Sequence, residues 1–203
     1  MLGSSRKCVI AMVTVLVGIA GSFFILVKAG APIAIAKPDA TKALVEFTSD
    51  GKLKRPVGYR KWVFIGEVIT PNDLNGGEAN FPEFHAVYMD PESFAEYEKT
   101  GKFRDGTVVV KELSSVGTKE ATSGKGYFQG ELTGLETAIK DSKRFKDEPG
   151  NVAYFSFGHK YPLKAEVSKN AVASCNQCHQ QNAKDWVFSQ HYPVLRAAAP
   201  KSK

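Results

Sequence analysis

The sequence predicts an α+β fold, built mainly on an antiparallel β-sheet with a few helices. Short segments rich in aromatic and β-branched residues recur along the chain, and such segments are typical of strands. Loops and turn residues separate most of them, which favours hairpin connections and hence antiparallel pairing. Hydrophobic residues make up 43% and charged residues 24% of the 203 residues, a composition that excludes a disordered chain and fits one main domain.

The start of the chain has the pattern of an export leader. Arg6 and Lys7 precede an uncharged, mostly apolar run over residues 8–27, and small residues then lead to Ala36. A secretory signal peptide has this order, and the run is also long enough to remain as an N-terminal membrane anchor. We expect residues 1–36 to be a cleaved signal peptide or such an anchor, the only contact with a membrane. The basic start places the rest of the chain in the periplasm or its equivalent.

The charge of the chain gives no reason to expect a nucleic-acid partner. The formal net charge is +6, and it falls to +3 without the three basic residues of the leader. The remaining basic residues are spread along the chain, whereas nucleic-acid binding needs a basic patch or stripe. We therefore expect no nucleic acid among the partners.

The first strands of the domain follow a polar, lysine-rich lead-in over residues 37–57, which holds a short amphipathic piece at 44–47. Residues 59–69 are aromatic and β-branched and end before Pro71, so they predict a strand. Residues 84–89 have the same character and predict a second strand.

The next element is a helix with clear signals at both ends. Asp90 is a good N-cap, Pro91 suits the first helical position, and Gly101 suits the end. Beyond it, the same patterns predict strands at 107–113, 127–132 and 152–157, a loop at 118–126, and helices at 134–145, where Leu135 and Ile139 share a face, and at 171–193.

One motif carries specific chemistry, the run Cys175-Asn176-Gln177-Cys178-His179. A C-x-x-C-H run is typical of c-type haem attachment, in which the thiols form thioethers and the imidazole binds the iron. A zinc finger using His191 would need a second His soon after it, and a redox pair would need a thioredoxin-like setting; the sequence has neither. We therefore expect one covalently bound haem c per chain, held on a C-terminal helix.

The sequence offers no good second ligand for the iron. A Met sulfur takes that position in many electron-transfer cytochromes. Met89 is the only Met beyond the leader and lies in a predicted strand, and no Met follows His179. His85, His159 and His191 are each more often ordinary histidines than ligands. We expect an open iron site that binds or transforms a small ligand.

Several further motifs accompany the haem motif in order along the chain. They are YMDPESF at 88–94, FRDGT at 103–107 running on to KEL at 111–113, GYF at 126–128, EPGN at 148–151, and VF at 187–188 followed by YPVLRAA at 192–198. In this combination the chain closely resembles the cytochrome P-460 family, from about Tyr59 to Ala198. We expect residues 58–198 to form a haem domain of this kind and residues 199–203 to be a tail.

The resemblance implies a fold, a cofactor and an activity. Family members are periplasmic homodimers of mainly antiparallel β structure with one c-type haem, and the studied ones oxidise hydroxylamine. By resemblance, Cys175 and Cys178 form the thioethers and His179 is the proximal iron ligand. The side-chain nitrogen of Lys111 would be bonded to a haem meso carbon. This cross-link favours the catalytic branch over the related cytochrome c′-beta, which lacks it and binds gases without known turnover.

Two residues are expected to act on the distal side. Strand alternation puts Lys111 on the face of Val109, opposite Val110. If that face points inward, apolar neighbours favour a neutral, nucleophilic amine. His85 is the first candidate for a distal base, at a place where the family often has Arg. Further candidates for the base are Glu83, Glu112 and Glu166, and candidates for an apolar distal wall are Phe81 and Phe84.

These features together predict a periplasmic enzyme that oxidises hydroxylamine to nitrous oxide, nitrite or both. Electrons would leave one at a time to a soluble cytochrome. Two other functions stay open. A protein that binds NO or CO without turnover would lack the Lys111 bond, and a simple electron carrier would have a six-coordinate iron, through His159 or His191.

Overall fold

The computed structural model describes residues 44–81, 83–171 and 174–201. The predicted leader, residues 1–36, lies outside the described residues and stays a prediction, as does the first part of the lead-in. Within the described part of the chain, no helix is long and apolar enough to span a membrane.

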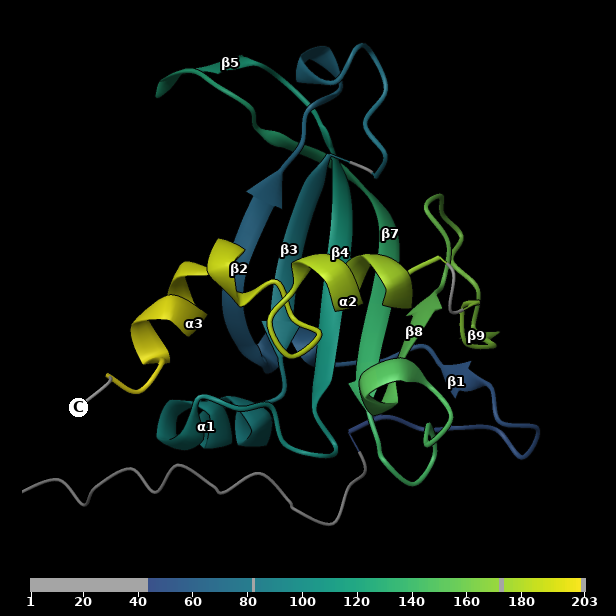
Figure 1. Ribbon diagram of the computed structural model, residues 1–203. Helices are drawn as coiled ribbons and strands as arrows, with labels where there is room; N and C mark the ends of the chain where they lie inside the picture. Colours follow the sequence, from purple (N-terminus) through teal and green to yellow (C-terminus); the bar gives the residue numbers. More distant parts are fainter. Residues whose placement is uncertain (1–43, 82, 172–173, 202–203) are drawn as a thin grey trace, which may run out of the picture. The chain divides into compact units, whose positions relative to one another are not determined.

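A five-stranded antiparallel sheet forms the centre of the fold and confirms the predicted fold class (Figure 1). Its strands, in spatial order, are β2 (Val63–Ile69), β3 (Phe84–Met89), β4 (Val108–Val116), β7 (Gln129–Lys140) and β8 (Val152–Ser156). Two small antiparallel pairs accompany it: β1 (Leu53–Lys54) with β9 (Glu166–Val167), and β5 (Glu120–Ala121) with β6 (Gly124–Lys125). The described residues also form three α-helices: α1 (Pro91–Thr100), α2 (Asn176–Asn182) and α3 (Pro193–Ala198).

Each face of the sheet buries its own group of apolar side chains. On one face Val108, Val110 and Leu135 pack with the segment around Phe47 that precedes β1. On the other face, a second cluster contains Val87 of β3 and Leu195 of α3. Strand alternation in β4 separates the two faces, as expected.

Helix α1 has the predicted bounds because its end signals are local. The buried carboxylate of Asp90 accepts a hydrogen bond from the Ser93 N–H at 2.9 Å, which caps the helix. Its other oxygen accepts from the Val108 N–H at 2.8 Å, so the cap also fixes the start of β4. Gly101 ends the helix with φ of 68°, a left-handed conformation that favours glycine.

The helix predicted at 134–145 is wrong, because this segment is the second half of β7. Leu135 and Ile139 are buried on one face together with Thr137, which is the alternation of a strand. Residues four apart share a face in a helix and in a strand alike, so this pair could not decide between them. Pairing with β4 on one side and β8 on the other makes the segment a strand.

The helix predicted at 171–193 is also wrong as a single element. After the short α2, Asp185 and Trp186 take φ values of 48° and 67°, which no helix allows. A 3-10 turn at Ser189–His191 follows, and Pro193 begins α3 instead of ending a helix. The strand predicted at 59–69 begins later, at Val63, because a 3-10 turn at Tyr59–Lys61 precedes it.

Candidate functional site

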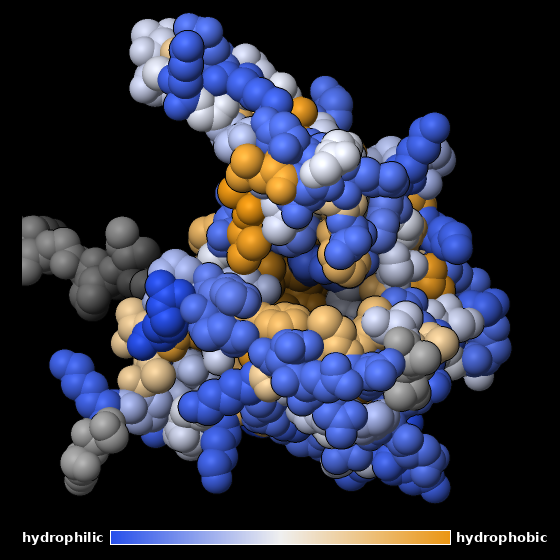
Figure 2. All heavy atoms as spheres, turned by 45° about the horizontal axis from the view of Figure 1, so that its top comes forward, coloured by the Kyte–Doolittle hydropathy of each residue, from blue (hydrophilic) through white to orange (hydrophobic). Residues whose placement is uncertain are grey.

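A cavity of about 340 Å³ lies between the central sheet and the segment that contains α2. Figure 2 shows the surface hollowed in this region, with hydrophobic side chains around the hollow. All five strands of the sheet contribute to the lining, which is mostly apolar. Its apolar members include Val68, Val87, Val109, Ala138, Phe155, Val187 and Phe188.

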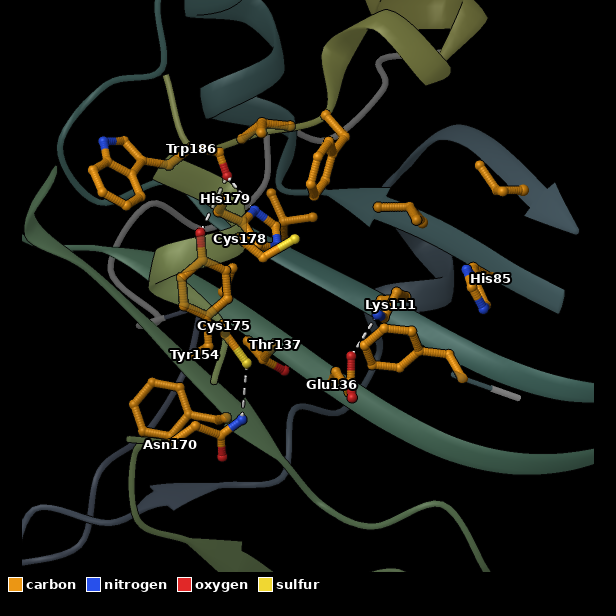
Figure 3. A pocket seen from close by; sticks show the side chains of 18 of the residues that line it. His85, Lys111, Glu136, Thr137, Tyr154, Asn170, Cys175, Cys178, His179 and Trp186 are labelled. Atoms are coloured by element: carbon orange, nitrogen blue, oxygen red, sulfur yellow. Dashed lines mark hydrogen bonds and ion pairs between the residues drawn. The ribbon is translucent and has the colours of Figure 1, made fainter. Parts of the chain in front are cut away.

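Cys175, Cys178 and His179 all line this cavity, as Figure 3 shows. Cys175 is the N-cap of α2 and the other two lie in its first turns, so one short helix presents two thiols and an imidazole together. Both thiols are free and form no disulfide. Asn176, between them, is buried and donates a hydrogen bond to the Val152 carbonyl at 2.7 Å, which anchors α2 to the start of β8.

The imidazole of His179 is held in one orientation. Its Nδ1 lies 2.8 Å from the Trp186 carbonyl, so Nδ1–H donates there and Nε2 is the nitrogen left for a metal. The centre of the Tyr154 ring, in β8, lies 4.5 Å from the centre of the imidazole ring. The centre of the Phe188 ring, in the segment after α2, lies 4.6 Å from it. Burial lowers the pKa of His179, and the positive charge of Lys111 adds to this effect. The neutral imidazole that binds iron is therefore the favoured form.

The carbonyl of Trp186 is itself well fixed. Gly150 has no side chain, and a Cβ there would lie 1.9 Å from Nε1 of Trp186, so the indole packs directly on this glycine. The carboxylate of Asp185 accepts from Lys140 at 2.8 Å and from the Phe103 N–H at 3.2 Å. The turn that orients His179 is thus held to the sheet and to the loop before β4.

Across the cavity, Lys111 and Glu136 face each other on neighbouring strands (Figure 3). Nζ of Lys111 lies 2.5 Å from Oε2 of Glu136 and 4.4 Å from the centre of the Phe81 ring. Oε1 of Glu136 lies 2.8 Å from Nε2 of His159. Burial raises the pKa of Glu136, but the hydrogen bond from His159 and the charge of Lys111 outweigh it and lower the pKa to about 2.

The structure brings most of the predicted site residues together. His85, Lys111 and Phe81 line the same cavity as the haem motif. Lys111 points into the cavity, as strand alternation predicts, although its amine is paired with a carboxylate and not surrounded by apolar groups alone.

The other candidates do not line the cavity. Met89 is fully buried in the second cluster, and Phe84 is buried at the other end of β3. Glu83 accepts hydrogen bonds from the backbone at Asn72 and Val116, and so holds a loop. Glu112 lies on the opposite face of β4, where it accepts from Tyr59 and Arg60; Glu166 lies in β9.

Among the site residues that sequence reasoning missed are Glu136, Asn170 and Trp186. Glu136 was hidden by the wrong helix at 134–145, since only a strand places it opposite Lys111. The side-chain amide of Asn170 lies 3.4 Å from the Cys175 sulfur, a contact without a sequence pattern. Trp186 acts through its carbonyl, which no pattern of side chains reveals.

The residues around the cavity fit a haem. The apolar lining suits a macrocycle, the two free thiols stand on the same helix, and the imidazole has one nitrogen engaged and the other available. This sheet and this donor set define a haem-binding cytochrome.

The comparison with known families identifies the cytochrome more closely. The family model described as Cytochrome P460 matches residues 56–189, and the chain belongs to that family. Membership implies a haem cofactor. No curated protein matches the chain.

Proposed function

We propose that this protein is a c-type haem enzyme that oxidises hydroxylamine and passes the electrons to another cytochrome. The observation that carries the proposal is the convergence of the haem motif, Lys111 and His85 on one apolar cavity. Bound haem supplies an iron centre that binds a small ligand and exchanges electrons. The chain supplies attachment, orientation and proton transfer.

The residues that would attach the haem lie in α2 and at its N-cap. Cys175 and Cys178 would form the two thioethers, and His179 would bind the iron through Nε2. The hydrogen bond to the Trp186 carbonyl keeps the ring in place and raises the basicity of the ligand. Met89 is not among the residues that line the cavity, which supports an iron that would keep a position for substrate.

Lys111 would form the cross-link to a haem meso carbon. Its position in β4 supports this role, because its side chain extends into the cavity from the wall opposite α2 (Figure 3). An amine must be unprotonated to form a bond to carbon. The carboxylate of Glu136, with Oε2 2.5 Å from Nζ, would hold the amine toward the cavity. The new bond would replace the hydrogen of the meso carbon, so an oxidant from outside this chain would have to take up the two electrons released.

His85 would take a proton from the substrate. It lies on β3 and faces the cavity, with its ring 6.0 Å from that of Phe81. Hydroxylamine must lose protons as well as electrons when it is oxidised, so a base near the bound substrate is required. The apolar side chains of Val87 and Val109 restrict water around this position.

The remaining expectations form part of the same proposal. The leader over residues 1–36 would direct the chain to the periplasm, and a soluble cytochrome there would accept the electrons. We propose a homodimer, as in the family that the chain resembles. The chain would carry one haem.

Two measurements on the purified holoprotein test this proposal. Peptide mass spectrometry should find the Cys175–His179 peptide linked through haem to the peptide of Lys111. Incubation with hydroxylamine and an oxidised cytochrome or dye should give nitrous oxide or nitrite in step with reduction of the acceptor. If the holoprotein does not reduce the acceptor when hydroxylamine is added, the proposed enzymatic function is refuted.

A gas-binding protein without turnover is the second candidate, and one observation favours it. The Lys111 amine is engaged in an ion pair with the carboxylate of Glu136, so it is not free to bond to a haem carbon. If the mass spectrum contains only the two thioethers, and NO binds without turnover of hydroxylamine, this second function is the correct one.

A further inference from the structure

We propose that Tyr154 tunes the haem iron through its proximal ligand, because its hydroxyl shares the carbonyl that His179 uses. The hydroxyl would weaken the hydrogen bond of His179 and so raise the reduction potential of the iron. The inference rests on the proposed function in one respect, that His179 binds the iron. Tyr154 acts through another residue, so its role is that of a positioning residue.

Within the described part of the chain, the carbonyl of Trp186 accepts hydrogen bonds from two side chains (Figure 3). Nδ1–H of His179 donates to it at 2.8 Å, and the hydroxyl of Tyr154 donates at 3.2 Å. A carbonyl oxygen has two lone pairs, so it can accept from both donors at once. The electron density of one oxygen is then divided between the donors, and the bond from His179 is weaker than it would be alone.

The turn that carries this carbonyl has an uncommon backbone. Asp185 and Trp186 have φ values of 48° and 67°, although neither is a glycine. Such residues cost free energy, and costs of this kind concentrate at functional sites. The ion pair of Asp185 with Lys140 and the packing of the indole on Gly150 hold the turn in place. Loss of one donor should therefore change the remaining hydrogen bond and leave the carbonyl where it is.

Tyr154 is itself placed by the central sheet. It is buried in β8, and the centre of its ring lies 4.5 Å from that of the His179 imidazole. Burial raises the pKa of Tyr154, so the hydroxyl keeps its proton and donates. In the same strand, the Val152 carbonyl accepts from Asn176 of α2. Strand β8 thus holds the attachment segment both before His179 and after it, at Trp186.

The strength of the His179 hydrogen bond bears on the iron. When Nδ1–H donates strongly, the imidazole becomes a more basic ligand, which stabilises the ferric state. A second donor on the same carbonyl reduces this effect and favours the ferrous state. Oxidation of hydroxylamine delivers electrons to the iron, so a higher reduction potential makes that transfer more favourable.

The variant Tyr154→Phe tests the inference without turnover, because it removes the donor and keeps the ring. The equilibrium constant for reduction of the iron, from redox titration of the holoprotein, should fall by about two- to fivefold. The iron–histidine stretching frequency in the resonance Raman spectrum of the ferrous protein should rise. Tyr97→Phe is the matched control, because Tyr97 is buried and is not among the residues that line the cavity. It should match the wild type in both measurements.

The direction of the change separates tuning from support. If Tyr154 only supported the turn, its loss would loosen the carbonyl and weaken the His179 bond. The equilibrium constant would then rise and the stretching frequency would fall. That result, or no change in either measurement, overturns the proposal.

A ring-fluorinated tyrosine at position 154 provides a second variant of nearly the same shape. Fluorination makes the hydroxyl a stronger donor, so below its pKa both measurements should move in the direction opposite to that of Tyr154→Phe. A shift in the same direction as Tyr154→Phe overturns the proposal.

Failure of the proposed function can be told apart from failure of this inference. A wild-type ferrous protein without an iron–histidine mode would reject His179 as the ligand, and the inference with it. If both measurements shift as expected but hydroxylamine reduces no acceptor, the enzymatic function is rejected and the tuning by Tyr154 is upheld.

Discussion

Replacing Gly150 with Ala tests how the proximal side of the site is held. The new Cβ would lie 1.9 Å from Nε1 of Trp186, so the indole must move, and its carbonyl orients His179. Gly150 also has φ of 65°, where a side chain costs about 1–2 kcal/mol. Overpacking adds about 1–3 kcal/mol. We expect Gly150→Ala to lower the free energy of unfolding by about 2–5 kcal/mol.

Gly58→Ala is the matched control, because Gly58 has φ of 74° and a Cβ there would meet nothing within 4 Å. Its loss of free energy of unfolding should reflect only the cost of placing a side chain on a left-handed backbone. Urea unfolding of both holoproteins measures the difference, and the absorption and EPR spectra of the iron report whether the ligand proposed at His179 is disturbed. If Gly150→Ala is no less stable than Gly58→Ala and has the wild-type spectra, the role given to the Trp186 turn is refuted.

Three further predictions concern other parts of the molecule. Asp90→Ala should lower the free energy of unfolding by about 2–4 kcal/mol, measured with urea, because the buried N–H groups of Ser93 and Val108 lose their acceptor; a loss below about 1 kcal/mol would contradict the dual cap. The lowered pKa of Glu136 should stabilise the protein above about pH 4.5 by about 3 kcal/mol, and this contribution should disappear as the pH falls towards 2. Glu136→Gln should therefore show a weaker loss of stability in that range by calorimetry, and an unchanged acid profile would contradict the ion pair. Cys178→Ala should leave a haem joined through one thioether, which mass spectrometry detects as one bond fewer to the attachment peptide; an unaltered linkage would refute its role.

Local signals account for the parts of the fold that the sequence could predict. Helix α1 was found with its end residues because Asp90, Pro91 and Gly101 act within one turn of where they stand. Strand β3 was found with its bounds for a similar reason, since its composition and its flanking turns are local. The haem motif is a local pattern too, and its residues line the cavity.

The errors arose where distant partners decide the structure. Leu135 and Ile139 fit a helix as well as a strand, and only pairing with β4 and β8 makes them a strand. The pair of Glu136 with Lys111 follows from that pairing and could not be seen without it. The break after α2 depends on the left-handed backbone of Asp185, which its hydrogen bonds from Lys140 and Phe103 stabilise.

The shortness of α2 has a consequence for the order of assembly. The helix has seven residues and buries only Asn176 among them, and a helix of that length is not stable alone in water. The strands that form the opposite wall all come earlier in the chain. During synthesis, every residue of the sheet is therefore made before α2. The stability of α2 must therefore come from its contacts with the rest of the chain, such as the hydrogen bond from Asn176 to the Val152 carbonyl, and from any group that fills the apolar cavity beneath it.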